Sequence, residues 1–96
     1  MKAAVYYETG APEVLRYEEV PDPVPGPGDV LVRVEAVSIE GGDTLHRSGG
    51  DLGALPHIVG YQCAGTVVGA GESVIALHVG DRVVTVGIDG SHAELR

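Results

Sequence analysis

The sequence is poor in the residues that build aromatic or disulfide-linked cores. Its 96 residues include no Trp and no Phe, four Tyr, one Met and one Cys. The single cysteine, Cys63, cannot form a disulfide within the chain, which fits a reducing compartment. With so few aromatics, the apolar mass comes from Val, Leu, Ile and Ala, and a core rich in β-branched valine favours strands.

Positive charge is also scarce. Six Lys and Arg stand against fourteen Asp and Glu, which gives a net charge of −8, and Lys2 is the only lysine. Binding to nucleic-acid phosphates or to an anionic membrane surface needs clustered cations. We therefore expect neither nucleic acid nor a membrane as a partner.

Long hydrophobic runs are missing as well. The apolar stretch after Lys2 is only Ala3-Ala4-Val5, which is too short for the core of a signal peptide. No run approaches the roughly 18 residues that mark a membrane-spanning helix. The sequence thus predicts a cytoplasmic protein. Its length, and a composition that is 44% hydrophobic, predict a single domain over residues 1–96 with one modest core.

Short alternating apolar segments separated by Gly and Pro predict six or seven strands and a mainly β fold, either barrel or sandwich. The clearest segment is 29–38, where Val30, Val32 and Val34 share a face. Segment 14–20 alternates imperfectly, which suggests an edge strand. Further strands are expected at 2–7, 61–69 and 82–87, with another beginning in 91–95, and 73–79 is an apolar segment. Residues 21–28 carry four prolines and predict a rigid surface connection, and 51–60 a loop.

Two motifs fail on inspection. Gly69-Ala70-Gly71 begins like a dinucleotide-binding loop, but Val74 replaces the third glycine and no helix fits before Gly80, so we expect a hairpin turn. The four histidines and Cys63 show no metal-binding spacing. Most of the histidines lie in or beside turns, where a solvated side chain is ordinary. Cys63 is expected to be a small buried apolar residue.

A carboxylate pair, Glu40 and Asp43, flanks the glycines at 41 and 42. Paired glycines allow a backbone to approach a ligand closely, which makes this junction a candidate site. The chemistry alone favours a plainer interpretation, in which Asp43 is the N-cap of a short helical turn through Arg47 and Glu40 is solvated.

Five segments then show a resemblance that covers the chain from 1 to 96. They are the opening 1–39, EGGDTLHRSG (40–49), LPHIVGYQCAGTVVGAG (55–71), VGDRVV (79–84) and GSHAEL (90–95). Together they resemble the N-terminal, GroES-like catalytic domain of the medium-chain dehydrogenase/reductase family. The resemblance implies a partly open β-barrel with one or two short helical turns. It also implies that a Rossmann nucleotide-binding domain and a returning C-terminal segment lie outside these residues, so that the chain is a fragment.

Departures from the family pattern indicate the branch. Glu40 stands where zinc-dependent members place a Cys ligand, and Gly60-Tyr61-Gln62 replaces their Gly-His-Glu. Since Tyr and Gln are poor Zn²⁺ ligands, the chain resembles the zinc-independent, quinone-oxidoreductase-like branch, with no metal site. That branch transfers hydride from NADPH to quinones or activated enones.

The resemblance also implies roles for particular residues. Tyr61 and Asp43 are the expected catalytic residues, and the expected cofactor-binding residues are Glu40, Thr44 and Gln62. The branch often has Asn in the position of Glu40 and Tyr in the position of Leu45, so this chain departs from it at both.

Two other functions remain open. The chain could be a non-enzymatic GroES-like assembly or binding module, or a zinc enzyme with unusual ligands. We expect the isolated chain not to bind NADPH tightly and, as the catalytic domain of a quinone-type reductase by itself, to be nearly inactive. We also expect a homo-oligomer that forms through exposed edges and apolar patches.

Overall fold

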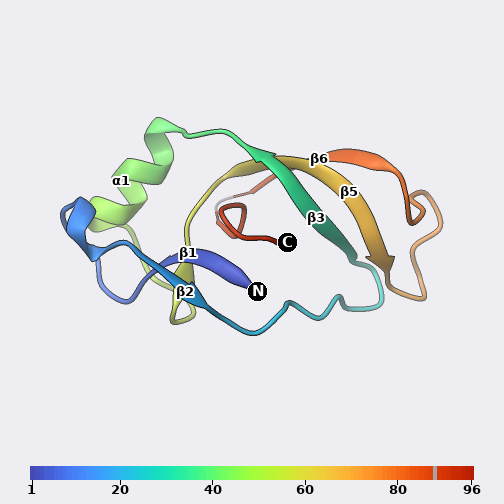
Figure 1. The fold of residues 1–96 in the computed structure, drawn as a ribbon, viewed down its shortest axis with the longest axis horizontal. Helices are drawn as coiled ribbons and strands as arrows, with labels where there is room; N and C mark the ends of the chain where they lie inside the picture. Colours follow the sequence, from blue (N-terminus) through green and yellow to red (C-terminus); the bar gives the residue numbers. More distant parts are fainter. Residues whose placement is uncertain (88) are drawn as a thin grey trace.

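The computed structural model describes residues 1–87 and 89–96. The strands are β1 (Lys2–Tyr6), β2 (Arg16–Glu19), β3 (Val30–Val37), β4 (His57–Ile58), β5 (Gln62–Ala70) and β6 (Arg82–Val86). A short 3-10 helix, η1 (Pro12–Val14), precedes β2, and one α-helix, α1 (Gly41–Gly49), follows β3. The expected mainly β class, with one or two short helical turns, is confirmed (Figure 1).

The strands form two antiparallel sheets of three, in the orders β2-β1-β4 and β3-β5-β6. The last residues join both sheets, because Ala93 bridges to Ala3 of β1 and Leu95 bridges to Arg33 of β3. Figure 1 shows this C-terminal segment between the two sheets, with α1 at one end of the molecule. Strand β2 lies at a sheet edge, as the imperfect alternation of 14–20 predicts.

The buried core is small and built from short side chains. It takes alternate positions from both sheets, as expected where one face of a sheet is covered. Its apolar members are Ala3, Val5, Tyr6, Val32, Val59, Cys63 and Val67. The prediction that Cys63 is buried is confirmed.

The apolar segment 73–79 forms no strand, and Ile75 is 87% exposed. Two segments differ from the sequence-based prediction. The segment 91–95 makes only isolated bridges. Conversely, the expected loop 51–60 contains β4, in which Ile58 pairs with Val5 of β1. A strand of two residues is too short to show an alternating pattern in the sequence. Pairing with the distant strand β1 makes these residues a strand.

The Gly69–Gly71 segment ends β5, and none of the residues described after it, 72–87 and 89–96, forms a helix. The Gly71 amide donates to the Asp29 carbonyl at 2.8 Å, and the backbone of the proline-rich segment leaves no room for a side chain at Gly71. The segment is therefore a turn packed against 21–28, and the phosphate-binding motif is absent there. In the part of the chain that the structure describes, no helix has the length and hydrophobicity to cross a membrane.

Candidate functional site

The candidate site begins at the first turn of α1. Glu40 is the N-cap, in extended conformation, and its backbone N–H donates to the Asp43 carboxylate at 2.9 Å. The helix therefore begins at Gly41, and Asp43 is its third residue rather than the N-cap that we predicted. An acidic side chain at this position can reach back to the N-cap amide, as it does here.

Asp43 also connects α1 to the start of β5. The side chain is buried, and its second oxygen accepts the backbone N–H of Tyr61 at 3.0 Å. The ring nitrogen Nε2 of His92 lies 3.8 Å from the same carboxylate. One buried carboxylate thus joins the start of α1 to the residue before β5 and lies beside His92 from the end of the chain.

Tyr61 is held through its backbone N–H and its backbone carbonyl. Its N–H bonds to Asp43, and its carbonyl oxygen accepts from Nη1 of Arg96 and from the amide of Gly87, each at 3.0 Å. The ring lies over Gly42, where an added Cβ would be 2.6 Å from two ring carbons. Position 42 must therefore lack a side chain for the ring to occupy this place.

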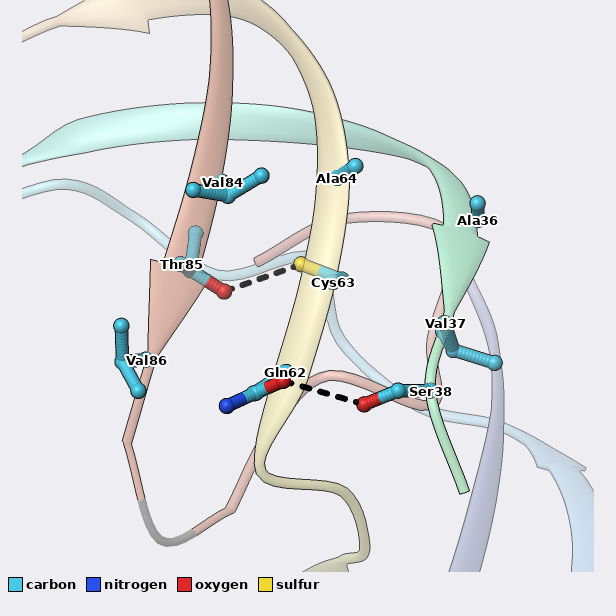
Figure 2. A pocket seen from close by; sticks show the side chains of 9 residues that line it. All are labelled: Ala36, Val37, Ser38, Gln62, Cys63, Ala64, Val84, Thr85 and Val86. Atoms are coloured by element: carbon cyan, nitrogen blue, oxygen red, sulfur yellow. Dashed lines mark hydrogen bonds between the residues drawn. The ribbon is translucent and has the colours of Figure 1, made fainter. Parts of the chain in front are cut away.

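A second polar group lies between β3 and β5. The Ser38 hydroxyl is 3.1 Å from Oε1 of Glu40 and 3.3 Å from Oε1 of Gln62. Nε2 of His92 donates to the Ser38 carbonyl at 3.2 Å. Because Gln62 uses its oxygen toward Ser38, its Nε2 remains available as a donor, and Figure 2 shows it pointing away from Ser38. Glu40 is therefore half-buried and hydrogen-bonded rather than solvated.

Two cavities adjoin these groups. The first, of about 420 Å³, lies on the sheet of β3, β5 and β6. Its lining is mostly apolar (Figure 2): Ala36, Val37, Ser38, Gln62, Cys63, Ala64, Val84, Thr85 and Val86. The Sγ atom of Cys63 is 3.1 Å from the Thr85 hydroxyl at its base.

The second cavity, of about 700 Å³, lies against α1. It is lined by Gly42, Leu45, His46, Gly49, Gly50, Asp51, Tyr61 and Asp89. Tyr61 and Gln62 are neighbours in the chain, but Tyr61 lines the second cavity and Gln62, the first residue of β5, lines the first.

The structure brings four of the five expected site residues into two pairs. Asp43 bonds directly to Tyr61, and Glu40 meets Gln62 through Ser38. Thr44 stands apart, because its hydroxyl donates to the Gly41 carbonyl within the helix. Thr44 contributes to neither cavity, and its cofactor-binding role stays a prediction, as do the roles of the other four.

The histidines only partly follow the expectation of solvated side chains. His78 is exposed, but His57 is buried, with ring centroids 4.9 Å from Tyr6 and 4.7 Å from His46. Burial lowers the pKa of His57, and nearby His46 lowers it further, while Asp89 opposes them. The pairing of β4 with β1 turns this side chain inward, which the local sequence did not indicate.

Ser38, His92 and Arg96 belong to the site, although sequence reasoning did not select them. Ser38 precedes the Glu40 motif and could have been found by its proximity. His92 and Arg96 reach the site from the far end of the chain, and only the tertiary structure shows this. Within residues 1–87 and 89–96, no three His, Cys, Asp or Glu side chains are arranged to hold a metal ion.

Comparison with known proteins identifies the family. The model of the alcohol dehydrogenase GroES-like domain matches residues 26–95. The chain belongs to this family. The expected GroES-like fold, that of the N-terminal domain of medium-chain dehydrogenases/reductases, is thereby confirmed.

Relatives and solved structures include both dehydrogenases and quinone oxidoreductases. The chain is 40% identical over 84 residues to an alcohol dehydrogenase of Schizosaccharomyces pombe, which covers 84% of this chain and 24% of the relative. It is 38% identical over 98 aligned residues to a quinone oxidoreductase of Lama guanicoe, covering 98% and 30% respectively.

A solved structure, Escherichia coli quinone oxidoreductase complexed with NADPH, matches with a TM-score of 0.93 and 30% identity. That match covers all of this chain and 30% of the other. The chain thus spans about a quarter to a third of the length of these proteins.

Proposed function

We propose that this chain is the substrate-side domain of an NADPH-dependent oxidoreductase that transfers hydride to a quinone or an activated enone without zinc. The observation that carries the proposal is the placement of Tyr61. This residue stands where zinc-dependent members have a metal ligand, and its ring lines the second cavity. Its hydroxyl makes no hydrogen bond within the part of the chain that the structure describes, so it is available to a ligand.

The residues present fit only one end of NADPH. Ser38, Glu40 and Gln62 offer donors and acceptors that suit the carboxamide of a nicotinamide. The phosphates do not fit, because no helix begins after Gly71 within the described residues and the second cavity carries the carboxylates Asp51 and Asp89. Phosphates favour helix N-termini and cations. We propose that a nucleotide-binding domain outside these residues binds them, and that bound NADPH supplies the hydride.

The chain's own residues would prepare the acceptor. Negative charge develops on a carbonyl oxygen of a quinone or enone as hydride reaches the conjugated carbon system. The Tyr61 hydroxyl would donate a hydrogen bond to that oxygen, where a zinc-dependent enzyme would use the metal. Asp43 and the apolar lining would keep Tyr61 in position and exclude water.

Domain exchange tests this function. Residues 1–96 would replace the matching segment of the Escherichia coli quinone oxidoreductase, and NADPH oxidation would be followed with duroquinone as acceptor. We expect turnover, and we expect Tyr61→Phe to lower kcat/KM roughly tenfold or more, the cost of one hydrogen bond to a charged group. Tyr17→Phe is the matched control, because Tyr17 is 73% exposed on β2. A folded exchange protein without turnover, or a Tyr61→Phe variant with unchanged kcat/KM, would refute the proposal.

One observation favours a second candidate, the corresponding domain of an alcohol dehydrogenase. The chain is as similar to an alcohol dehydrogenase as to a quinone oxidoreductase. Oxidation of an alcohol by the same exchange protein, with no quinone reduction, would support this alternative.

A further inference from the structure

We propose that Arg96 is a positioning residue, which together with Asp43 clamps Tyr61 over Gly42 and so shapes the wall of an acceptor site for planar quinones. This inference rests on the proposed function for the identity of the acceptor. The clamp itself rests only on contacts within the chain.

The clamp consists of opposite charges at the two ends of one residue. A buried carboxylate, Asp43, accepts the Tyr61 N–H at 3.0 Å, and the Arg96 guanidinium donates to the Tyr61 carbonyl at 3.0 Å. Hydrogen bonds to charged groups are about twice as strong as neutral ones. Tyr61 directly precedes β5, and its carbonyl already accepts the Gly87 amide. The added pair of charged partners therefore points to a residue whose orientation matters.

Several hydrogen bonds hold the Arg96 side chain in this position. Its Nη1 is also within hydrogen-bond distance of the hydroxyls of Thr85, at 2.7 Å, and Ser91, so that its two hydrogens are shared among these oxygens and the Tyr61 carbonyl. Among the described residues no carboxylate forms an ion pair with it, and its partners are all neutral oxygens. The guanidinium also lies close to Gly87, where a side chain would collide with it. Arg96 therefore fixes both the Tyr61 carbonyl and the turn after β6.

Gly42 is the residue against which the Tyr61 ring packs. The tip of the Tyr61 ring, including its hydroxyl oxygen, lies so close that an added Cβ would be 2.6–2.7 Å from three of its atoms. Side chains essentially never pack at this distance, so any other residue at 42 would displace the ring toward the cavity. Gly41, one residue earlier, has open space at the equivalent position.

The cavity beside this ring is lined by backbone and by an aromatic side chain, two surfaces on which a flat ligand can pack. Three of its eight lining residues are glycines of α1 and the turn that follows: Gly42, Gly49 and Gly50. Backbone therefore forms much of one wall, and the Tyr61 ring forms part of another. An aromatic ring prefers to stack, offset, on another planar system. A quinone could lie against Tyr61 with its carbonyl near the hydroxyl.

Nuclear magnetic resonance of the 96-residue chain tests both parts without any enzymatic activity. For the clamp, Arg96→Met should shift the amide and ring signals of Tyr61 and leave those of Tyr7 and Tyr17 unchanged, while Arg96→Lys should partly restore them. Arg82→Met is the control, since Arg82 is a surface residue paired with Glu35. Tyr61 signals that are the same in Arg96→Met and wild type would overturn the clamp.

For the acceptor, duroquinone is the probe, because its four methyl groups prevent addition to thiols. Titration should shift the signals of Gly42, Gly49 and Gly50. Gly42→Ala should weaken this binding about tenfold, or about 1.4 kcal/mol, whereas Gly41→Ala should not weaken it. Absence of these shifts in the wild type, or equal binding by Gly42→Ala, would overturn the acceptor site. An exchange protein without turnover would instead refute the proposed function and leave these results standing.

Discussion

Replacing Asp43 by Asn tests how much the site depends on one carboxylate. Each of its oxygens accepts one backbone N–H, from Glu40 at 2.9 Å and from Tyr61 at 3.0 Å. The side chain is only 4% exposed, so water cannot substitute. Asparagine keeps the shape but turns one acceptor into a donor, which leaves one amide without a partner. A buried unsatisfied group costs about 1–3 kcal/mol.

The expected loss can be measured by urea unfolding, followed by circular dichroism. We expect Asp43→Asn to lower the free energy of unfolding by about 1–3 kcal/mol, or the melting temperature by about 4–24 °C for a domain of this size. Asp43→Ala removes both acceptors and should cost about twice as much. That loss approaches the stability of a small domain, so Asp43→Asn is the quantitative variant.

The matched control is Asp51→Asn, because Asp51 is exposed and its side chain makes no hydrogen bond within the described residues. We expect its unfolding free energy to stay within about 0.5 kcal/mol of wild type. The backbone amide hydrogen of Tyr61 should exchange with solvent faster in Asp43→Asn than in the wild type or in Asp51→Asn. If Asp43→Asn unfolds like Asp51→Asn and the Tyr61 amide stays protected, the carboxylate does not hold the site together.

Four further predictions concern stability, cofactor and association. Burial lowers the pKa of His57 below 6.5. Just below pH 6.5 the His57 imidazole is therefore protonated more in the unfolded chain than in the native chain. The urea midpoint should therefore fall as the pH drops through about 6.5, and less so in His57→Phe; an unchanged slope would contradict this. Gly65→Ala should cost at least about 1–3 kcal/mol, because the new Cβ would collide with the Arg33 carbonyl. Gly53→Ala is the control, because a Cβ at position 53 has open space. Equal stabilities of the two variants would show that Gly65 is not tightly packed against Arg33. Calorimetry of the 96-residue chain should give no NADPH affinity in the range of about 1 μM; a signal there would place a phosphate site in this domain. Sedimentation should show self-association that strengthens with salt, since Val84 and Val86 are 77% and 78% exposed on the edge strand β6 and salt screens the net charge within about 10 Å at 0.1 M. A monomer at both ionic strengths would contradict that expectation.

The sequence predicted the parts of the fold that local patterns determine. Alternating valines located β3 and β6, and imperfect alternation placed β2 at an edge. It failed where distant contacts decide. Pairing with β1 makes β4 a strand, whereas the apolar residues 73–79 pair with no strand in the described structure.

The candidate site shows the same division. Glu40, Asp43, Tyr61 and Gln62 stand in motifs that can be read along the chain, and they occur in two contacting pairs. The capping role of Asp43 was assigned to the wrong position, because the choice between the N-cap and the third helical residue depends on where Glu40 turns. Arg96 could not be found from spacing, since it lies 35 residues from Tyr61 in sequence.

The central claim is that this domain prepares a quinone through Tyr61 rather than through a metal ion. The most direct measurement is the rate of NADPH-dependent duroquinone reduction by the exchange protein before and after treatment with a zinc chelator. We expect the same rate before and after chelation, and in both conditions we expect Tyr61→Phe to lower it. Loss of the activity on chelation and its recovery with added zinc would contradict the claim.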